Sequence, residues 1–236
     1  METPAGGSMP AFDRNKWLSP LSLLVTLGVI HLVDESILVP IILVPLWFVL
    51  FRPFNRSDLL MFLIAAVFIV GQNYSVLERG GFAFEEKDFL LMPFYEPFLW
   101  GFYYLNVKRF FSEDRERPRL EPRAFAGVGI TAVCFSAFGG NDFRLLLATL
   151  VSTGILLWMF HRPYDLYYAA YALALGFVVE IFGVSTGLWS YPNPDFLGMP
   201  YWSATMWISV GILGRRFLIP FSEWLSGKPA RRGRGR

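Results

Sequence analysis

The sequence is poor in charge and nearly free of cysteine and histidine. Only 17% of its 236 residues are charged, whereas 54% are hydrophobic and 18% are aromatic. This composition is typical of an integral membrane protein rather than of a soluble domain. A single cysteine, Cys134, excludes both an intrachain disulfide framework and a cysteine metal cluster. The two histidines, His31 and His161, are too few for a histidine-rich di-iron site.

Motifs of nucleotide-dependent and soluble hydrolytic enzymes are also absent. The sequence has no Walker loop, no dinucleotide-binding glycine fingerprint and no Gly-x-Ser-x-Gly elbow. The sequence therefore identifies no cofactor and requires none, and the cofactor is unknown. Nucleic-acid binding has no support beyond the short basic tail, and none is predicted. We expect this tail to be disordered and attracted to anionic lipid.

Apolar runs separated by short polar segments predict an all-α, polytopic membrane bundle. Residues 17–225 form one predicted transmembrane domain, between a lead of residues 1–16 and a tail of residues 226–236. About eight helices are expected; seven is the alternative if residues 17–51 are not a hairpin. The predicted spans are residues 17–33, 36–51, 59–74, 89–106, 124–140, 145–160, 166–188 and 201–220.

Lysine and arginine are unevenly distributed between the two sides of this predicted topology. The segments on the side of the N-terminus carry most of them, and so does the C-terminal tail. The positive-inside rule therefore places both termini in the cytoplasm, as expected for a protein of the bacterial cytoplasmic membrane. The opposite, outer segments hold only Arg79, Lys87 and Arg144.

The functional interpretation centres on Gly176–Tyr191, GFVVEIFGVSTGLWSY. Glu180 lies inside this apolar helix, where a charge costs about 3 kcal/mol and normally faces protein, water or a partner. Gly176, Gly183 and Gly187 fall on the same helical face. Because glycines let neighbouring helices approach closely, we expect Glu180 to point into the bundle. It is either a buried structural acid or a functional one.

A second carboxylate, Glu96, lies in MPFYEPFLWGFYYL, between Pro93 and Pro97. Each proline removes a helical hydrogen-bond donor, so the sequence predicts a kinked helix at Glu96. Trp100 and Tyr103 follow at four and seven residues and share its face. A proline-kinked packing helix is the alternative to a functional acid.

The predicted topology gathers the intramembrane polar groups at the outer ends of the helices and leaves the cytoplasmic halves apolar. We therefore expect a pocket open toward the outer leaflet, with Glu96 and Glu180 facing it as paired catalytic acids. The segment 190–202 is expected to form a lid over this pocket or an aromatic belt. The candidate substrate-binding residues are Trp100, Tyr103, Trp189, Tyr191, Trp202 and Asn73.

Arg215 and Arg216 interrupt the last apolar run. Long basic side chains near the end of a span usually extend toward the membrane surface. We therefore expect both arginines to reach the cytoplasmic interface, with residues 217–225 lying along the membrane surface.

The first hairpin turn contains the only candidate metal ligands, His31, Asp34 and Glu35. Asp34 and Glu35 follow His31 at three and four residues, so their side chains can share one face with it. Histidine with carboxylates can bind a divalent metal. A polar cap where the hairpin leaves the membrane is the favoured interpretation, and no metal site is predicted.

The pattern E-x-x-G-x-x-T-G-x-W-x-Y, which starts at Glu180, resembles a motif of multi-span bacterial and archaeal proteins. They include carotenoid hydratases of the bisanhydrobacterioruberin type and uncharacterised membrane families. The resemblance is confined to Glu180–Trp202. It departs from the hydratase-like pattern at Leu188-Trp189-Ser190, where that pattern has Phe-Gly before the tyrosine. The resemblance implies a polytopic helical fold and isoprenoid substrates.

Two functional interpretations follow. The first is a membrane-embedded enzyme that acts on a lipid or isoprenoid by protonation, hydration, cyclisation or isomerisation. A carboxylic acid kept neutral by an apolar pocket can protonate an alkene, and aromatic faces stabilise a carbocation. The second is a non-enzyme, either an accessory or structural subunit of a membrane complex or a small proton-coupled carrier. Apolar cytoplasmic halves count against transport.

The charge distribution yields a topology test. Green fluorescent protein fused after Arg236 should fluoresce, and alkaline phosphatase at the same point should be inactive, because the tail is cytoplasmic. A fusion within residues 141–144 should give the opposite pattern. Phosphatase activity from the C-terminal fusion would overturn the predicted orientation.

Overall fold

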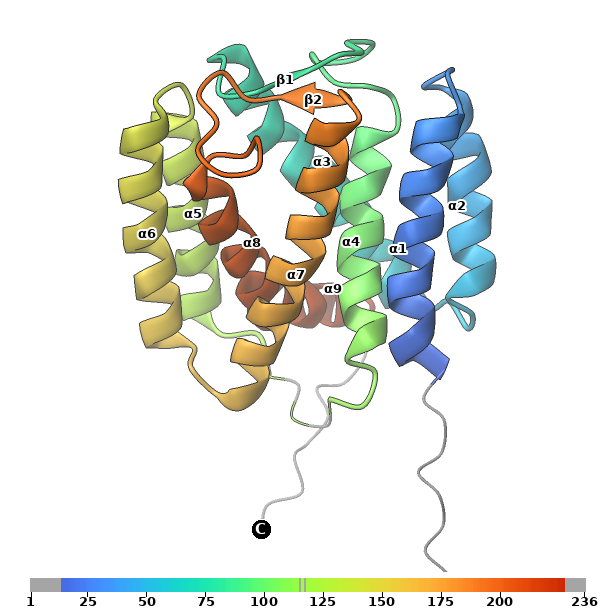
Figure 1. Ribbon diagram of the computed structural model, residues 1–236. Coiled ribbons are helices and arrows are strands. Elements are labelled where there is room, and N and C mark those ends of the chain that lie inside the picture. The colour runs from blue at the N-terminus through green and yellow to red at the C-terminus, as the bar shows by residue number, and fades with distance from the viewer. Residues whose placement is uncertain (1–13, 115, 117, 228–236) are drawn as a thin grey trace, which may run out of the picture.

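The computed structural model describes residues 14–114, 116 and 118–227 (Figure 1). Parts of the predicted lead and tail therefore lie outside the described residues. Within them the chain runs up and down through eight helices, ending in a π-helical turn η1 (Gly214–Leu218) and a short helix α9 (Ile219–Leu225). The eight are α1 (Arg14–Leu32), α2 (Leu38–Leu50), α3 (Arg56–Glu78), α4 (Glu96–Phe110), α5 (Pro122–Phe138), α6 (Asp142–Met159), α7 (Pro163–Ser185) and α8 (Tyr201–Leu213).

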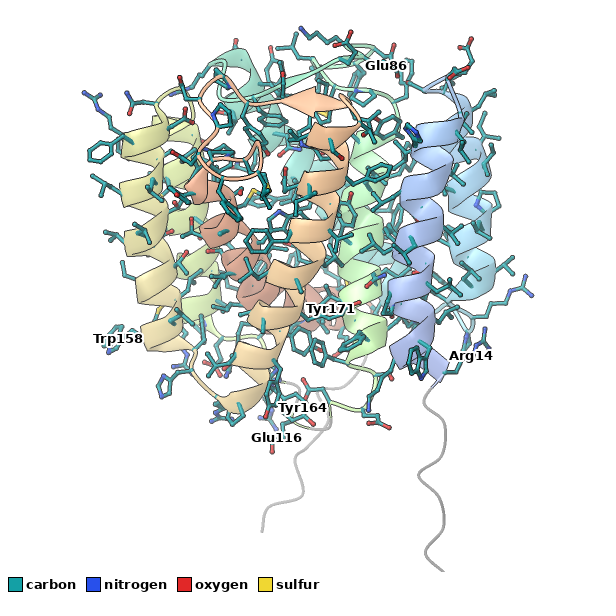
Figure 2. The ribbon with its side chains drawn as sticks, viewed as in Figure 1. Arg14, Glu86, Glu116, Trp158, Tyr164 and Tyr171 are labelled. Atoms are coloured by element: carbon teal, nitrogen blue, oxygen red, sulfur yellow. The ribbon has the colours of Figure 1, made fainter. Side chains whose placement is uncertain are left out.

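The two ends of the bundle differ in construction. A two-stranded antiparallel sheet covers one end, with β1 (Ala83–Phe84) paired to β2 (Trp189–Ser190). We call this the capped end; Glu86 lies there (Figure 2). The other end, called the terminal end, holds Arg14 (Figure 2). The even number of passes returns the chain to the terminal end after α8, so both ends of the described chain lie on one side of the bundle, in the arrangement that the sequence predicts.

The helix exteriors suit a bilayer. By length and hydropathy α3, α6 and α7 are long and apolar enough to cross a membrane, and α2 and α5 are shorter apolar helices. Large hydrophobic side chains are exposed on the outer faces of the bundle, where lipid replaces water as the solvent. Examples are Leu32, Val67, Val133, Val151 and Trp158.

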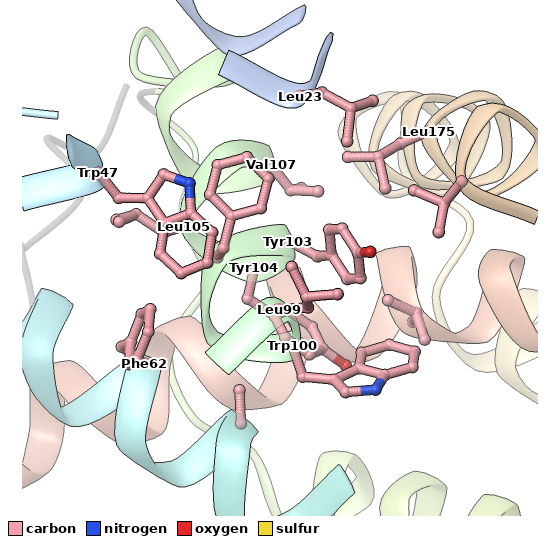
Figure 3. Packing of buried hydrophobic residues seen from close by; sticks show 14 of the residues in the cluster. Leu23, Trp47, Phe62, Leu99, Trp100, Tyr103, Tyr104, Leu105, Val107 and Leu175 are labelled. Atoms are coloured by element: carbon pink, nitrogen blue, oxygen red, sulfur yellow. The ribbon is translucent and has the colours of Figure 1, made fainter. Parts of the chain in front are cut away.

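Helix α4 lies at the centre of the main core. The hairpin of α1 and α2 packs on one side of it through Trp47, whose ring stacks on Phe102 with centroids 4.6 Å apart. Trp47 also donates a hydrogen bond to Thr26 at 2.8 Å, which joins the two hairpin helices. Trp100 and Tyr103 leave α4 on the side away from Trp47 (Figure 3). This helix therefore separates the hairpin from the region that holds the candidate site.

The predicted start of α4 is wrong. Residues 89–95 form a turn in which Leu90 and Leu91 have positive φ, and the helix begins at Glu96. Pro97 therefore lies in the first helical turn. Backbone N–H groups in this turn have no intrahelical acceptor, so a proline here costs no helical hydrogen bond. As a result Glu96 stands at a helix N-terminus rather than at a kink within a helix.

The arginines of η1 are buried, not extended to the interface. Arg215 and Arg216 are 1% and 3% exposed. Arg215 binds Asp165 at 2.6 Å and Asp114 at 3.0 Å, and Arg216 binds the same Asp165. Helix α9 then packs against α3, so the predicted surface segment is wrong as well. Buried carboxylates close by, which the apolar pattern of α8 does not reveal, account for the burial of the two arginines.

A second buried ion cluster joins α3 to α4 at the terminal end. Asp58 lies 2.8 Å from the Lys108 ammonium and 2.9 Å from the Arg109 guanidinium. Arg109 also donates to the backbone carbonyls of Phe51 and Pro53, at the end of the hairpin. Paired charges therefore hold this end of the bundle together, and they lie in the segments that the sequence predicts to connect the spans.

The Asp165 cluster should matter for stability. Asp165→Asn weakens the pairing of two buried arginines, a change that typically costs about 3–5 kcal/mol of unfolding free energy when a partner is lost. We expect a clear drop in the melting temperature of the purified protein in detergent. Glu113→Gln is the control, because the Glu113–Lys16 pair is exposed and such pairs contribute less than about 1 kcal/mol. Equal melting temperatures for both variants would contradict a stabilising role.

Candidate functional site

A mostly apolar cavity of about 280 Å³ lies between α3, α4, α5, α7 and α8. It follows α3 from Ile64 to Val76, a distance of about 18 Å at the helical rise of 1.5 Å per residue. Phe84 of β1 and Trp189 of β2 line it at the capped end, and Phe221 of α9 lines it toward the terminal end. Its length and composition suit an elongated apolar molecule.

The structure places every sequence-predicted site residue on the wall of this one cavity. Glu96 and Glu180 face it together, as expected, although one starts α4 and the other lies in the second half of α7. The catalytic and binding roles assigned to these residues stay predictions. The eight residues are Glu96, Glu180, Trp100, Tyr103, Trp189, Tyr191, Trp202 and Asn73.

Glu180 is 5% exposed and accepts three hydrogen bonds from neutral donors. Trp189 donates its indole N–H to Oε2 at 3.1 Å, and Tyr191 donates its hydroxyl to the same oxygen at 2.7 Å. Trp207 of α8 donates to Oε1 at 3.1 Å. Both oxygens are therefore occupied, and the carboxyl group joins α7 to β2 and α8.

Glycines make room for these donors. A Cβ at Gly176 would lie 2.2 Å from the Trp207 ring, and a Cβ at Gly183 would lie 2.0 Å from the Trp189 ring. The two glycines stand four residues before and three residues after Glu180, so each indole rests on α7 beside the carboxyl group it binds. The prediction that Glu180 points inward is confirmed, but the glycines admit side chains rather than a neighbouring helix backbone.

The turn after α7 brings the residues that follow it back to Glu180. Gly187 has φ +76°, a conformation that glycine adopts without strain, and Leu188 N–H bonds back to the Gly183 carbonyl. This turn starts β2, which places Trp189 and Tyr191 above Glu180. The third glycine of the predicted face therefore ends the helix instead of packing it.

Only one of the two carboxyl oxygens of Glu96 accepts hydrogen bonds. Asn73 and Trp100 both donate to Oε1 at 2.9 Å. Among the described residues Oε2 has no hydrogen-bond partner, and the residue lines the cavity. Its position in the first turn of α4 also exposes it to the positive end of the helix dipole. Glu96 thus offers a free carboxyl oxygen to a ligand, whereas Glu180 does not.

Aromatic rings connect the two acids. Trp100, which binds Glu96, stacks on Trp207, which binds Glu180, with centroids 5.4 Å apart. Tyr103 packs edge-on against both indoles, at 5.7 and 5.6 Å. Directly packed rings therefore lie between the two carboxyl groups.

Other predicted and missed residues complete the wall. Trp202 lines the cavity with its ring but donates its N–H to Asp142 at 2.9 Å, away from both acids. Trp207 was not predicted as a site residue, although it follows the motif and bears an indole donor. Two further lining residues, Gln72 and Thr131, were also missed, and each has a buried side-chain oxygen without a partner among the described residues.

The candidate metal ligands do not assemble. His31 is exposed and its ring packs edge-on against Phe182, 5.9 Å between centroids. Asp34 and Glu35 belong to the acidic surface at the capped end, where partial burial and the charges of Asp88, Glu35 and Asp34 raise the pKa of Glu86. No group of three or more His, Cys, Asp or Glu side chains within the described part of the chain is arranged to hold a metal ion.

Comparison with known proteins identifies the fold. No family model matches the chain, and no curated protein matches it. Among solved structures it is similar to MvINS, a mycobacterial Insig homologue from Mycobacterium vanbaalenii, with a TM-score of 0.65 and 16% identity. The match covers 76% of this chain and 99% of that one, and a cross-linked MvINS trimer matches equally well. The likeness confirms the predicted polytopic helical membrane bundle.

The packing of Trp207 on Gly176 can be tested directly. Gly176→Ala places a methyl group inside the Trp207 ring, so the ring must move and its bond to Glu180 is lost; we expect a loss of about 2–4 kcal/mol. Gly154→Ala in α6 is the control, because a Cβ there meets open space and alanine favours the helix. Melting temperatures in detergent and tryptophan fluorescence spectra measure the difference. A Gly176→Ala protein with the stability and spectrum of wild type would contradict this packing.

Proposed function

We propose that the protein is a membrane-embedded enzyme that acts on an isoprenoid or another unsaturated lipid by acid–base chemistry. The observation that carries the proposal is the unpartnered Oε2 of Glu96 on the wall of a long apolar cavity. A general acid or base must have a free oxygen within reach of the substrate. The cavity supplies that oxygen beside aromatic rings and away from any described basic side chain.

In this proposal Glu96 is the catalytic acid. Its Oε2–H adds a proton to one carbon of an alkene: the π electron pair forms the new C–H bond, and the O–H bond breaks. A carbocation and the Glu96 carboxylate remain. Loss of a proton from a neighbouring carbon to Oε2 completes an isomerisation. Attack by a second alkene closes a ring and forms a new carbocation, which loses a proton to complete a cyclisation. Attack by water forms a protonated alcohol, which loses a proton to complete a hydration. The carboxylate receives the final proton in each case.

Aromatic side chains supply the other half of the mechanism. A carbocation is attracted to the negative faces of aromatic rings, by about 0.5–2 kcal/mol for each favourable contact. Trp100 and Tyr103 line the cavity within four and seven residues of Glu96 on the same helix. Glu180, with both oxygens occupied, holds Trp189, Tyr191 and Trp207 in place and is assigned a positioning role.

Orientation and location are part of the same proposal. We place the terminal end in the cytoplasm of a bacterial cell, with the basic tail near anionic lipid and the capped end outside. The polar groups of the cavity then lie in the outer half of the bilayer, where a lipid substrate would enter from the outer leaflet. An accessory subunit or a proton-coupled carrier remains the alternative. The buried charges of the terminal end are paired, which does not favour a continuous polar path for a carrier.

The proposal is tested by Glu96→Gln. The side-chain carbonyl of the introduced glutamine can still accept from Asn73 and Trp100 while its amide faces the cavity, so the fold should persist without the titratable proton. We expect conversion to fall by about 10²-fold or more, seen as a precursor lipid that accumulates in extracts of cells carrying the variant. Glu86→Gln, at an acid of the capped end away from the cavity wall, is the control. Wild-type lipid profiles at equal protein levels of the Glu96→Gln variant would favour the accessory-subunit interpretation.

A further inference from the structure

Buried acids fall into two groups in the described part of the chain. Asp58, Asp114 and Asp165 each form an ion pair with a lysine or arginine at 3.0 Å or less. Glu96 and Glu180 are as deeply buried, at 6% and 5% exposure, but are bound only by neutral indole, amide and phenol donors. The protein therefore pairs its structural acids with cations and leaves the two cavity acids without one.

This difference has an energetic consequence. A buried carboxylate without a cation is costly, because neutral hydrogen bonds replace only part of its lost hydration. A positive charge brought into the cavity by a ligand offsets that cost, since Glu96 has an oxygen free to meet it. A neutral ligand of the same shape would not offset it.

The walls suit the same kind of ligand. Aromatic rings bind quaternary ammonium groups through cation–π attraction. Trp100, Tyr103 and Trp207 form one packed set of rings that lines the cavity between the two acids. Beyond them the cavity is apolar along α3, which provides space for a hydrocarbon chain.

We propose that the cavity selects ligands that combine an apolar chain with a positively charged end, such as an amine or a quaternary ammonium group, and binds that end beside Glu96. This inference rests on the cavity of the proposed function and names a ligand class for it. An ammonium group on a prenyl chain also resembles the carbocation that protonation of an alkene would produce. Tight binding of such a molecule is therefore compatible with catalysis but does not require it.

The experiment compares two probes on the purified full chain in a non-ionic detergent. One probe is farnesyl trimethylammonium; the other is its neutral isostere, in which carbon replaces nitrogen. Quenching of tryptophan fluorescence measures both affinities. We expect the wild-type protein to bind the charged probe roughly tenfold or more tightly than the neutral one. Glu96→Gln should abolish the preference, and Glu86→Gln should keep it. Because all variants share the same micelle, differences between them report on the protein.

Two outcomes overturn the inference: equal affinity of the wild-type protein for both probes, or an undiminished preference in folded Glu96→Gln protein. The lipid extracts separate this result from the proposed function. If the preference depends on Glu96 but the Glu96→Gln cells have a wild-type lipid profile, the cation site stands and the enzyme proposal fails. If the wild-type protein shows no preference but Glu96→Gln cells accumulate a precursor, the enzyme proposal stands and the cation site fails.

Discussion

The carboxyl group of Glu180 is the interaction on which the capped half of the molecule depends. Its three donors come from β2 and α8 and from Tyr191 directly after β2, so one side chain fixes the sheet and the last span against α7. The arrangement requires two glycines on the same face, because each indole occupies the space where a Cβ would stand. A buried acid without this set of donors would carry the full desolvation cost of its oxygens. The glycines, the acid and the aromatic residues of the motif therefore act as one unit, and Glu180, Trp189 and Tyr191 of that unit line the cavity.

The buried charged and acidic side chains have different kinds of partner at the two ends of the bundle. At the terminal end, Arg215 binds two aspartates at once, so each of these buried charges contacts a charge of opposite sign. Its guanidinium also lies over the rings of Tyr164 and Tyr168. Such clusters hold loops and helices together but leave nothing for a ligand. At the capped end, neutral donors occupy both oxygens of Glu180 but only one oxygen of Glu96. The free oxygen of Glu96 is the result, and it separates a binding site from a structural cluster.

Much of this arrangement follows from local sequence patterns. Apolar runs and charge bias predict the number of passes, and the spacing of Gly176, Glu180 and Gly183 predicts an inward-facing acid because helical periodicity alone decides which residues share a face. Partners that lie far apart along the chain cannot be predicted in this way. Arg215 and Asp114 are 101 residues apart in the sequence, and no local pattern around either residue predicts that they pair. The start of α4 was missed because Pro97 is compatible with both a kink and a first helical turn.

The likeness to an Insig homologue places the chain in a known architecture without settling its chemistry, since one fold supports unrelated functions. The residues that line the cavity indicate which function the fold supports in this protein. A protein that only binds a neutral lipid has no need for a buried acid with a free oxygen, because apolar side chains would line such a cavity at lower cost. Glu180 is explained by the three donors that it joins, but retaining Glu96 with one oxygen left free is costly for the fold alone. The cost is explained if that oxygen meets a proton acceptor or a positive charge on the ligand, and for this reason we assign the chemistry to Glu96 rather than to the more fully bonded Glu180.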